Sequence, residues 1–209
     1  MSQMQEAQLA ILPLIAWRVW AITTSEPWEG VPGPVLRGAW GHPWPGPELE
    51  ARCLNPPVRK SVFSAFLFGR EKRAHQSPAP FLSCDCGIYA RKPGDSDDLW
   101  VVRIAHLPMA GGFIEMSGVV IEGSKGFRAQ RARLVGPVEV WVPCADCRSP
   151  ATEIFIRDHL FRGRCNRHAA GDVPGMARDE WMDYVVPALG RRYRVPVVGV
   201  EEGVADGHR

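Results

Sequence analysis

The run Phe113-Ile-Glu-Met-Ser-Gly-Val-Val-Ile-Glu122 is followed by Gly123-Ser-Lys-Gly126 and then by Phe127-Arg-Ala-Gln-Arg-Ala-Arg-Leu134. Both outer runs are rich in residues that favour strands, and the glycines between them are typical of a turn. Runs of the same kind occupy residues 99–105 and 138–142, and Gly111-Gly112 and Gly136-Pro137 supply further turn signals. We therefore predict a meander of antiparallel strands at the centre of the chain.

The other predicted elements are short, because Gly and Pro together occupy 40 of the 209 positions, 21 Gly and 19 Pro. Residues 14–22 and 48–54 are predicted strands, and residues 58–73 are a predicted helix. Later in the chain we predict a hairpin from residues 151–157 and 160–164, a short helix over residues 179–189 that Pro187 ends or kinks, and a last strand over residues 191–200. The sequence thus predicts a β-rich α+β fold.

The apolar stretch over residues 9–22 does not have the character of a membrane or targeting segment. It is 14 residues long, contains Pro13 and is interrupted by Arg18, whereas a membrane span needs roughly 20 apolar residues. A secretory signal starts with basic residues, but this start has Glu6 and no early Lys or Arg. We therefore expect a cytoplasmic protein, a compartment in which clustered Cys and His more often bind metal than form disulfides.

The six cysteines and two of the six histidines divide into two sets of four. The clearer set combines two short motifs, Cys144-Ala-Asp-Cys147 and Cys165-Asn-Arg-His168. Each motif can wrap around one side of a metal ion, and four such ligands fill the tetrahedral shell of zinc, so the site is closed and structural. The alternative is a redox dithiol at Cys144 and Cys147, but Pro150 and the predicted hairpin do not match the strand–helix context of that motif.

The second set is Cys53, His75, Cys84 and Cys86. It contains the three cysteines that remain, and Gly87 would let the backbone turn tightly beside a metal. His42 is an alternative to His75 as the fourth ligand, and three reduced cysteines without metal are a further alternative. We predict two structural zinc sites, although Cys and His sets of this kind also fit iron.

Two parts of the chain resemble known proteins. Ala51-Arg-Cys53, His75, Cys84-Asp-Cys86-Gly-Ile-Tyr-Ala90, Ser117-Gly-Val-Val120 and Lys125-Gly-Phe-Arg-Ala129 follow one another in the order seen in an uncharacterised family of bacteria, their phages and plasmids. The resemblance covers roughly residues 14–142 and departs at Glu115-Met-Ser-Gly118, where Leu-Trp-Gly is expected. It implies a metal or structural role for the Cys and His positions and no activity.

Separately, residues 144–168, with Pro150-Ala151 after the first motif, resemble a zinc ribbon. Zinc ribbons occur in proteins that bind nucleic acids and in proteins that bind other proteins, so this resemblance implies a fold and leaves the function open. We predict a β-rich domain with a Cys/His metal site over residues 1–142. A second domain over residues 143–209 would hold the zinc ribbon, the short helix and the last strand.

The chain has an uneven charge distribution. Residues 124–194 contain 13 Lys or Arg and 8 Asp or Glu, an excess of five, although the whole chain carries only +2. Arginine binds phosphate through its planar fork, and interleaved aromatic residues such as Phe127 and Phe155 suit stacking on bases. The alternative is a solvated arginine-rich surface. The candidate nucleic-acid contacts are Lys125, Arg128, Arg131, Arg133, Arg157, Arg162, Arg164 and Arg167.

No common catalytic motif occurs in the sequence: it lacks His-Glu-x-x-His, the P-loop, Gly-x-Ser-x-Gly and the zinc-deaminase pattern. We therefore expect a non-enzymatic, zinc-stabilised binding protein whose basic ribbon half contacts nucleic acid or a nucleoprotein partner. A protein–protein adaptor that uses the Trp- and Pro-rich residues 28–47 is the alternative. A zinc-dependent hydrolase is a third hypothesis, which requires a site with only three protein ligands.

Overall fold

The computed structural model describes residues 13–24, 33–38, 42–53, 79–82, 84, 86–92, 106–157, 160–168 and 175–201. The helix predicted over residues 58–73, the strand predicted over residues 99–105 and the predicted ligand His75 lie outside the described residues.

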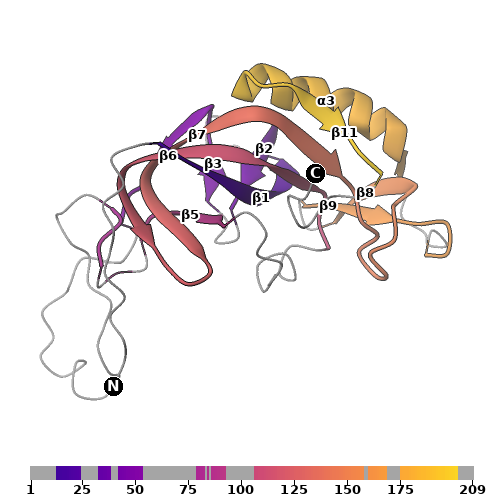
Figure 1. Ribbon diagram of the computed structural model, residues 1–209. Coiled ribbons are helices and arrows are strands. Elements are labelled where there is room, and N and C mark those ends of the chain that lie inside the picture. The colour runs from indigo at the N-terminus through magenta and orange to yellow at the C-terminus, as the bar shows by residue number, and fades with distance from the viewer. Residues whose placement is uncertain are drawn as a thin grey trace, which may run out of the picture.

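A long hairpin forms the centre of the molecule. Its strands are β6 (Met109–Glu122) and β7 (Gly126–Trp141), which pair antiparallel and arch across the molecule in Figure 1. The turn predicted at residues 123–126 is confirmed, because the N–H of Gly123 donates to the carbonyl of Gly126 over 2.8 Å. The predicted β-rich α+β fold with an antiparallel sheet is also confirmed.

Two predicted turns are instead irregularities within these strands. Phe113 pairs with Val135 and Gly112 pairs with Val138, so Gly136 and Pro137 bulge out of β7 without ending it. Gly136 has a φ of +78°, a conformation that glycine adopts without strain. The separate strands predicted over residues 127–134 and 138–142 are therefore one strand.

Gly111 lies inside β6, because its missing side chain makes room for two tryptophans. An added Cβ would lie 2.7 Å from Cζ2 of Trp17 and 3.1 Å from Cζ3 of Trp141. The glycine pair 111–112 therefore does not form a turn. It marks a place inside a strand where neighbouring side chains approach the backbone closely.

The first edge of the hairpin is covered by strands from the beginning of the chain. Strand β1 (Leu14–Thr24) pairs antiparallel with β6, which confirms the strand predicted over residues 14–22. The sheet continues from β1 through β2 (Pro34–Arg37) to β3 (Pro43–Trp44). Within the Trp- and Pro-rich segment, Trp44 is buried and meets Trp20 edge to face at a centroid distance of 5.4 Å.

The second edge of β7 pairs in turn with three short strands. They are β4 (Glu48–Glu50), β5 (Ile88–Arg91) and β11 (Val197–Gly199), of which only β11 runs parallel to β7. The strand predicted over residues 48–54 is shorter than expected, although the N–H of Ala51 still donates to the carbonyl of Gln130. Strand β7 thus pairs with segments that are far apart in the sequence.

A separate three-stranded sheet contains β8 (Glu153–Arg157), β9 (Leu160–Arg164) and β10 (Met176–Ala177). Strands β8 and β9 pair antiparallel as the predicted hairpin does. Strands β8 and β9 and the loops before β8 and after β9 form the unit that we call the ribbon, residues 143–168, and β10 pairs with β8 from outside this unit.

Helix α3 (Arg178–Tyr193) begins near the predicted start but continues through Pro187. Its buried face repeats every four residues at Trp181, Val185, Leu189 and Tyr193. Pro187 and Asp183, whose carbonyl has no N–H of residue 187 to bond, both lie on the exposed side of the helix, so the unpaired carbonyl is not buried in the core. The predicted end at residue 189 and the strand predicted from residue 191 are therefore wrong; the strand begins at Val197.

Packing joins the two predicted domains. Helix α3 lies above β7 and β11 in Figure 1, and its residues share one hydrophobic core with β1, β6 and β7. The buried Tyr193 hydroxyl accepts a hydrogen bond from the N–H of Leu36 over 2.9 Å and donates to the carbonyl of Trp44 over 2.7 Å. The division between residues 142 and 143 stays a prediction. Among the described helices, none is long and apolar enough to cross a membrane.

Candidate metal centres

The four predicted ligands of the ribbon converge on one point. The sulfur atoms of Cys144, Cys147 and Cys165 and a ring nitrogen of His168 all lie within 4.8 Å of one another. The Sγ atoms of Cys147 and Cys165 are 3.6 Å apart, and Nδ1 of His168 lies 3.4 Å from the Sγ atoms of Cys144 and Cys165.

These distances match the edges of a zinc tetrahedron. With Zn–S bonds of about 2.3 Å and Zn–N bonds of about 2.05 Å, tetrahedral angles place two sulfurs about 3.8 Å apart and a sulfur and a nitrogen about 3.6 Å apart. Three of the six distances between donor atoms are thus close to tetrahedral edges, and the four atoms together could hold a metal ion. We call this set, Cys144, Cys147, Cys165 and His168, the ribbon centre.

Backbone hydrogen bonds shape the first loop of the ribbon centre. The N–H of Cys144 donates to the carbonyl of Ser149, and the N–H of Arg148 donates back to the carbonyl of Cys144. Arg148 has a φ of +63°, the left-handed conformation that usually carries glycine. The loop therefore closes at the expense of backbone strain in Arg148.

The sheet places this loop against the second one. The N–H of Ala145 donates to the carbonyl of Gly163 on β9, and an added Cβ at Gly163 would lie 2.4 Å from the carbonyl oxygen of Pro143. In the second loop, the N–H of His168 donates to the carbonyl of Cys165. Glycine at position 163 thus lets the two ligand-bearing loops approach closely.

Without metal, hydrogen bonds already favour thiolate in the first loop. Hydrogen bonds from the side chain and backbone of Ser149 lower the pKa of Cys147 to about 6. Burial opposes ionisation of Cys144, but the N–H groups of Cys147, Cys165 and Asp146 together lower its pKa. Since the thiolate is the form that binds metal, this electrostatic environment prepares the loop for a cation.

Three ligands of the second predicted set also come together. The sulfurs of Cys53, Cys84 and Cys86 lie within 4.8 Å of one another, and those of Cys53 and Cys84 are 3.7 Å apart, again close to a tetrahedral edge. The predicted fourth ligand, His75, lies outside the described residues. His42, the sequence alternative, is described but is not part of the cluster. We call the set Cys53, Cys84 and Cys86 the sheet centre.

Strand β7 explains why these cysteines meet. Cys53 follows β4, and Cys84 and Cys86 precede β5, and both strands pair with the same edge of β7. The two strands lie one after the other along this edge of β7. The cysteines at their ends therefore meet although 30 residues separate Cys53 from Cys84 in the sequence. In contrast to Cys144 and Cys147 of the ribbon centre, burial and the neighbouring Cys84 raise the pKa of Cys86 to about 11.

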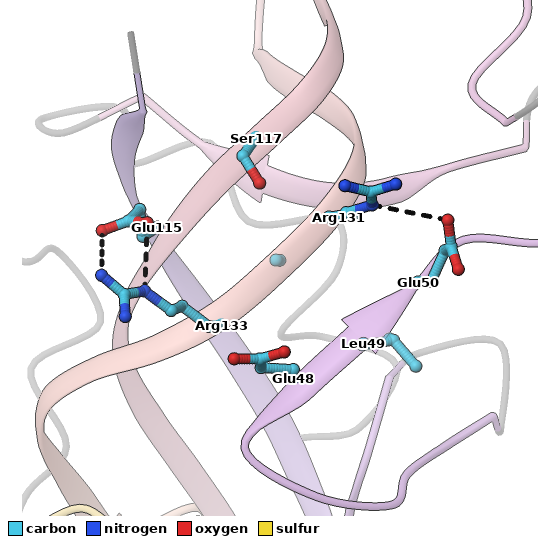
Figure 2. Close-up of a pocket in the computed structure, with 8 residues that line it drawn as sticks. Glu48, Leu49, Glu50, Glu115, Ser117, Arg131 and Arg133 are labelled. Atoms are coloured by element: carbon cyan, nitrogen blue, oxygen red, sulfur yellow. Dashed lines mark hydrogen bonds and ion pairs between the residues drawn. The ribbon is translucent and has the colours of Figure 1, made fainter.

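Two predicted nucleic-acid contacts on β7 are engaged with carboxylates of this chain. Register places Arg133 between Glu115 on β6 and Glu48 on β4, and its guanidinium binds Glu115 over 2.8 and 3.0 Å. Arg131 lies 3.5 Å from Glu50. Figure 2 shows both arginines in one groove with these acids, so the groove is close to charge balance.

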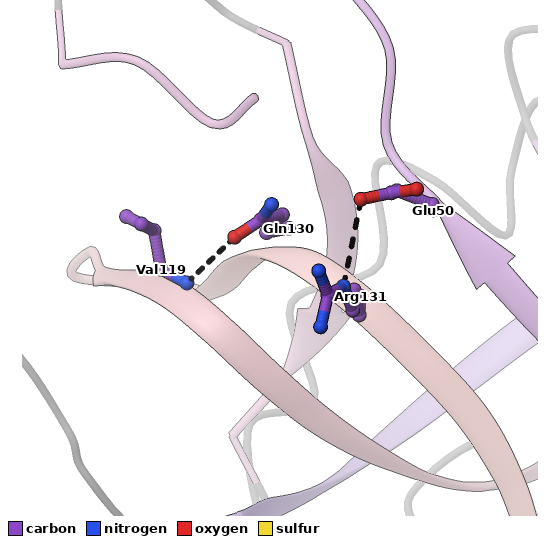
Figure 3. Close-up of polar contacts among 4 residues, drawn as sticks. All are labelled: Glu50, Val119, Gln130 and Arg131. Atoms are coloured by element: carbon purple, nitrogen blue, oxygen red, sulfur yellow. Dashed lines mark hydrogen bonds and ion pairs between the residues drawn. The ribbon is translucent and has the colours of Figure 1, made fainter. Parts of the chain in front are cut away.

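Neighbouring residues of β7 form separate polar contacts. Gln130 accepts a hydrogen bond from the N–H of Val119 over 3.4 Å, whereas Arg131 turns to Glu50 (Figure 3). Arg128 turns to the sheet centre and donates to the carbonyls of Cys84 and Cys86. The basic residues of β7 therefore do not form one continuous surface.

The ribbon arginines differ in exposure. Arg164 is 7% exposed and covers the ring of Phe155 at 4.4 Å, and Arg162 is half-buried. Arg157 at the end of β8 and Arg167 in the second loop are exposed, as is Lys125 at the tip of the β6–β7 hairpin. Nucleic-acid contact by any of these residues stays a prediction.

Sequence reasoning missed Arg148 as a functional candidate. It is exposed and lies next to the ligand Cys147, so the two ligand loops present Arg148 and Arg167 beside the same centre. Its place directly after the Cys-x-x-Cys motif is the signal that could have identified it.

Comparison of the chain with protein-family models, with curated proteins and with solved structures found no match in any of the three.

Proposed function

We propose that this chain is a non-enzymatic binding protein stabilised by two structural zinc ions. The observation that carries the proposal is the convergence of four Cys and His donor atoms in the ribbon centre at tetrahedral spacing. Three thiolates and one imidazole fill the coordination shell of zinc, which leaves no position for a substrate or a catalytic water. Cys-rich ligand sets with knuckle spacing favour zinc over other divalent metals.

In the sheet centre, His75 completes the set of Cys53, Cys84 and Cys86. The proposal is supported by the pairing of β5 with β7, which puts the Cys-x-Cys-Gly-Ile-Tyr-Ala motif beside the Gly-Phe-Arg-Ala motif: Tyr89 pairs with Arg128 and Ile88 with Ala129. Adjacent strands account for the joint presence of the two motifs. We retain the resemblance to the uncharacterised proteins of bacteria, their phages and plasmids as part of this proposal.

Metal content tests the two centres. The full-length protein, purified without chelator, is expected to contain two zinc ions per chain. Cys144→Ser and Cys53→Ser are each expected to remove one of them. A wild-type chain with a single zinc that only Cys144→Ser removes would limit the proposal to the ribbon centre. A chain that retains its metal in the Cys53→Ser variant would favour the hydrolase hypothesis, because three ligands would then suffice.

The ribbon provides the proposed surface for nucleic acid or a nucleoprotein partner in the cytoplasm. Arg148, Arg157 and Arg167 are exposed on it, and Ile156 is 60% exposed beside Arg157. Arginine forks suit phosphate, and an exposed apolar side chain can contact a base or sugar. The groove on β7 is a weaker candidate because its arginines are paired with carboxylates.

Salt dependence of binding tests this surface. If three arginines each contact a phosphate of a single strand, the logarithm of the binding constant should fall with the logarithm of salt concentration with a slope of about −2. Arg148→Ala, Arg157→Ala and Arg167→Ala combined should abolish most of this slope, and Arg131→Ala should leave it unchanged. Binding that is insensitive to salt, or equally weakened by Arg131→Ala, would contradict the proposal.

A groove beside α3 supports the adaptor function as a second candidate. It lies between the described part of residues 28–47 and α3, where Tyr184 is 56% exposed. Its lining residues are Gly33, Pro34, Pro45, Tyr184, Ala188, Arg191 and Arg192. A photo-crosslinking residue at position 184 should then capture a polypeptide that one at position 125 does not, and equal capture at both positions would count against this function.

A further inference from the structure

The sheet centre lies against an arginine that is not one of its ligands. Arg128, on β7, donates a hydrogen bond from its guanidinium to the carbonyl of Cys84, and the same nitrogen lies 3.4 Å from the carbonyl oxygen of Cys86. Because one cation contacts the backbone of both ligands, it holds the two ends of the Cys-x-Cys segment on the same side of β7. No hydrogen bond of this kind was expected for a residue predicted to contact nucleic acid.

The surrounding residues fix the guanidinium in this position. Tyr89, which pairs with Arg128 across β5 and β7, places its ring 5.9 Å from the guanidinium carbon. Gly87, with a φ of +127°, passes so close that an added Cβ would lie 3.3 Å from Cβ of Arg128 and 3.0 Å from Cβ of Pro80. The loop that carries the ligands is therefore packed directly on the stem of this arginine.

A second arginine forms a hydrogen bond with β5, the strand that follows Cys84 and Cys86. Arg18 on β1 donates a hydrogen bond to the carbonyl of Tyr89. Its guanidinium also lies 5.4 Å from the ring of the buried Trp44. Strand β5 is thus held from β1 on one side and from β7 on the other, and Arg128 alone of these two contacts the ligand segment.

We propose that Arg128 is the positioning residue of the sheet centre, which it preorganises for metal and whose charge it offsets. The inference rests on the proposed metal centre. Three thiolates around a zinc ion carry one net negative charge, and the guanidinium of Arg128 beside the ligand segment offsets it. Hydrogen bonds to the ligand carbonyls also reduce the entropy that the loop loses when the metal binds. Removal of such outer contacts lowers metal affinity by about 10- to 100-fold.

The test compares Arg128→Met with Arg128→Lys in the full-length, zinc-loaded protein. A chelator is titrated, free cysteines are alkylated, and mass spectrometry counts the label at Cys53, Cys84 and Cys86 apart from that at the ribbon cysteines. Arg128→Met should release zinc from the sheet centre at a chelator concentration about 10- to 100-fold lower than the wild type requires. Arg128→Lys keeps the charge but lacks the planar fork of the guanidinium. The chelator concentration that releases its zinc should therefore lie between those of Arg128→Met and the wild type.

Two controls are present in the same chain. The ribbon cysteines should keep their wild-type protection in both variants, which shows that the fold is intact. Arg131→Met removes an exposed arginine three residues along the same strand and should leave both centres unchanged. With saturating Co²⁺, the thiolate-to-metal absorption of Arg128→Met should equal that of the wild type, because the ligands remain and only the affinity changes.

The outcomes separate the two proposals. Wild-type zinc affinity in Arg128→Met, or equal loss from both centres, would overturn the role of Arg128 and leave the metal centre standing. If zinc never protects Cys53, Cys84 and Cys86 in the wild type, the sheet centre itself is wrong, and the role of Arg128 fails with it.

Discussion

The conformation of the residue after a ligand determines how easily a metal-binding loop closes. In the ribbon centre this residue is Arg148, with a φ of +63° and an N–H that donates to the carbonyl of Cys144. A side chain in this region clashes with its own backbone, at a cost of roughly 1–2 kcal/mol. The chain thus tolerates strain at a position whose arginine side chain is exposed.

Arg148→Gly should relieve this strain. The free energy of unfolding of the zinc-loaded protein should rise by about 1 kcal/mol, measured by urea denaturation. Asp146→Gly in the same loop is the control, because Asp146 has no positive φ to relieve and glycine there only adds freedom to the unfolded chain. A loss of stability in Arg148→Gly as large as that in the control would contradict the assigned conformation.

One thiol of each centre, Cys147 and Cys86, should ionise in different pH ranges in metal-free protein. The pKa of Cys147 is lowered to about 6 by Ser149, and that of Cys86 is raised to about 11 by burial. Since only the thiolate reacts with iodoacetamide, Cys147 should be labelled rapidly at pH 7.5 and Cys86 slowly. Equal labelling rates at these two residues, resolved by mass spectrometry, would count against the electrostatic difference between the centres.

The lowered pKa of Cys147 also predicts how its contribution to the stability of the metal-free protein depends on pH. A group whose pKa is lower in the folded state contributes stability above its unfolded pKa, near 9, and loses that contribution as the pH falls toward 6. The contribution of Cys147 to the stability of the metal-free protein should therefore shrink as the pH falls from 9 to 6, whereas Cys165, whose pKa is raised, acts in the opposite direction, so urea denaturation of Cys147→Ser against the wild type at both pH values isolates the effect of Cys147.

At the scale of elements, α3 shows how a buried face outweighs a local signal. Trp181, Val185, Leu189 and Tyr193 are all buried, so continuation of the helix past Pro187 brings Leu189 and Tyr193 into the core. Burial of two such side chains contributes several kcal/mol, and an interior proline costs roughly 3 kcal/mol. Packing therefore decides where this helix ends.

Pro187→Ala should stabilise the protein, because alanine restores the N–H that bonds the carbonyl of Asp183 and has the highest helix propensity. The expected gain is about 1–3 kcal/mol in the free energy of unfolding, measured by denaturant titration. Pro196→Ala is the control, since Pro196 lies between α3 and β11, and its carbonyl, which accepts a hydrogen bond from the N–H of Val138, is kept in the variant. An equal gain from both substitutions would point away from a helix effect.

At the scale of the whole molecule, a single hydroxyl connects the beginning and the end of the chain. The buried Tyr193 on α3 bonds Leu36 on β2 and Trp44 on β3, and burial raises the pKa of its phenol to about 12. The hydroxyl therefore stays protonated, and both hydrogen bonds persist, up to strongly alkaline pH.

Tyr193→Phe should lower the free energy of unfolding by about 1–3 kcal/mol, because the N–H of Leu36 and the carbonyl of Trp44 lose their buried partner. Tyr184→Phe removes an exposed hydroxyl from the same helix and should change stability by less than about 0.5 kcal/mol. Thermal unfolding of Tyr193→Phe should remain a single transition, because both ends of the chain share one core. Two separate transitions in the wild type would instead support independent domains.

Local patterns in the sequence were sufficient for the turn of the central hairpin, for the ribbon hairpin and for the four Cys and His residues that come together in the ribbon centre. Alternation, turn glycines and Cys-x-x-Cys spacing all act within a few residues of one another, and the structure brings these residues together as expected. The three cysteines of the sheet centre were found by elimination, and the structure explains their meeting through β7.

Tertiary structure alone decided how glycine, proline and arginine are used. Gly136 and Pro137 bulge inside β7 because β6 continues on one side and β11 pairs on the other, and Pro187 stays in α3 because residues beyond it pack in the core. Arg128 faces Cys84 and Cys86 because β5 and β7 are neighbours across 40 residues of sequence. Ligand spacing is a local property that the sequence carries by itself, whereas these positions depend on long-range pairing and burial, which no short window of sequence contains.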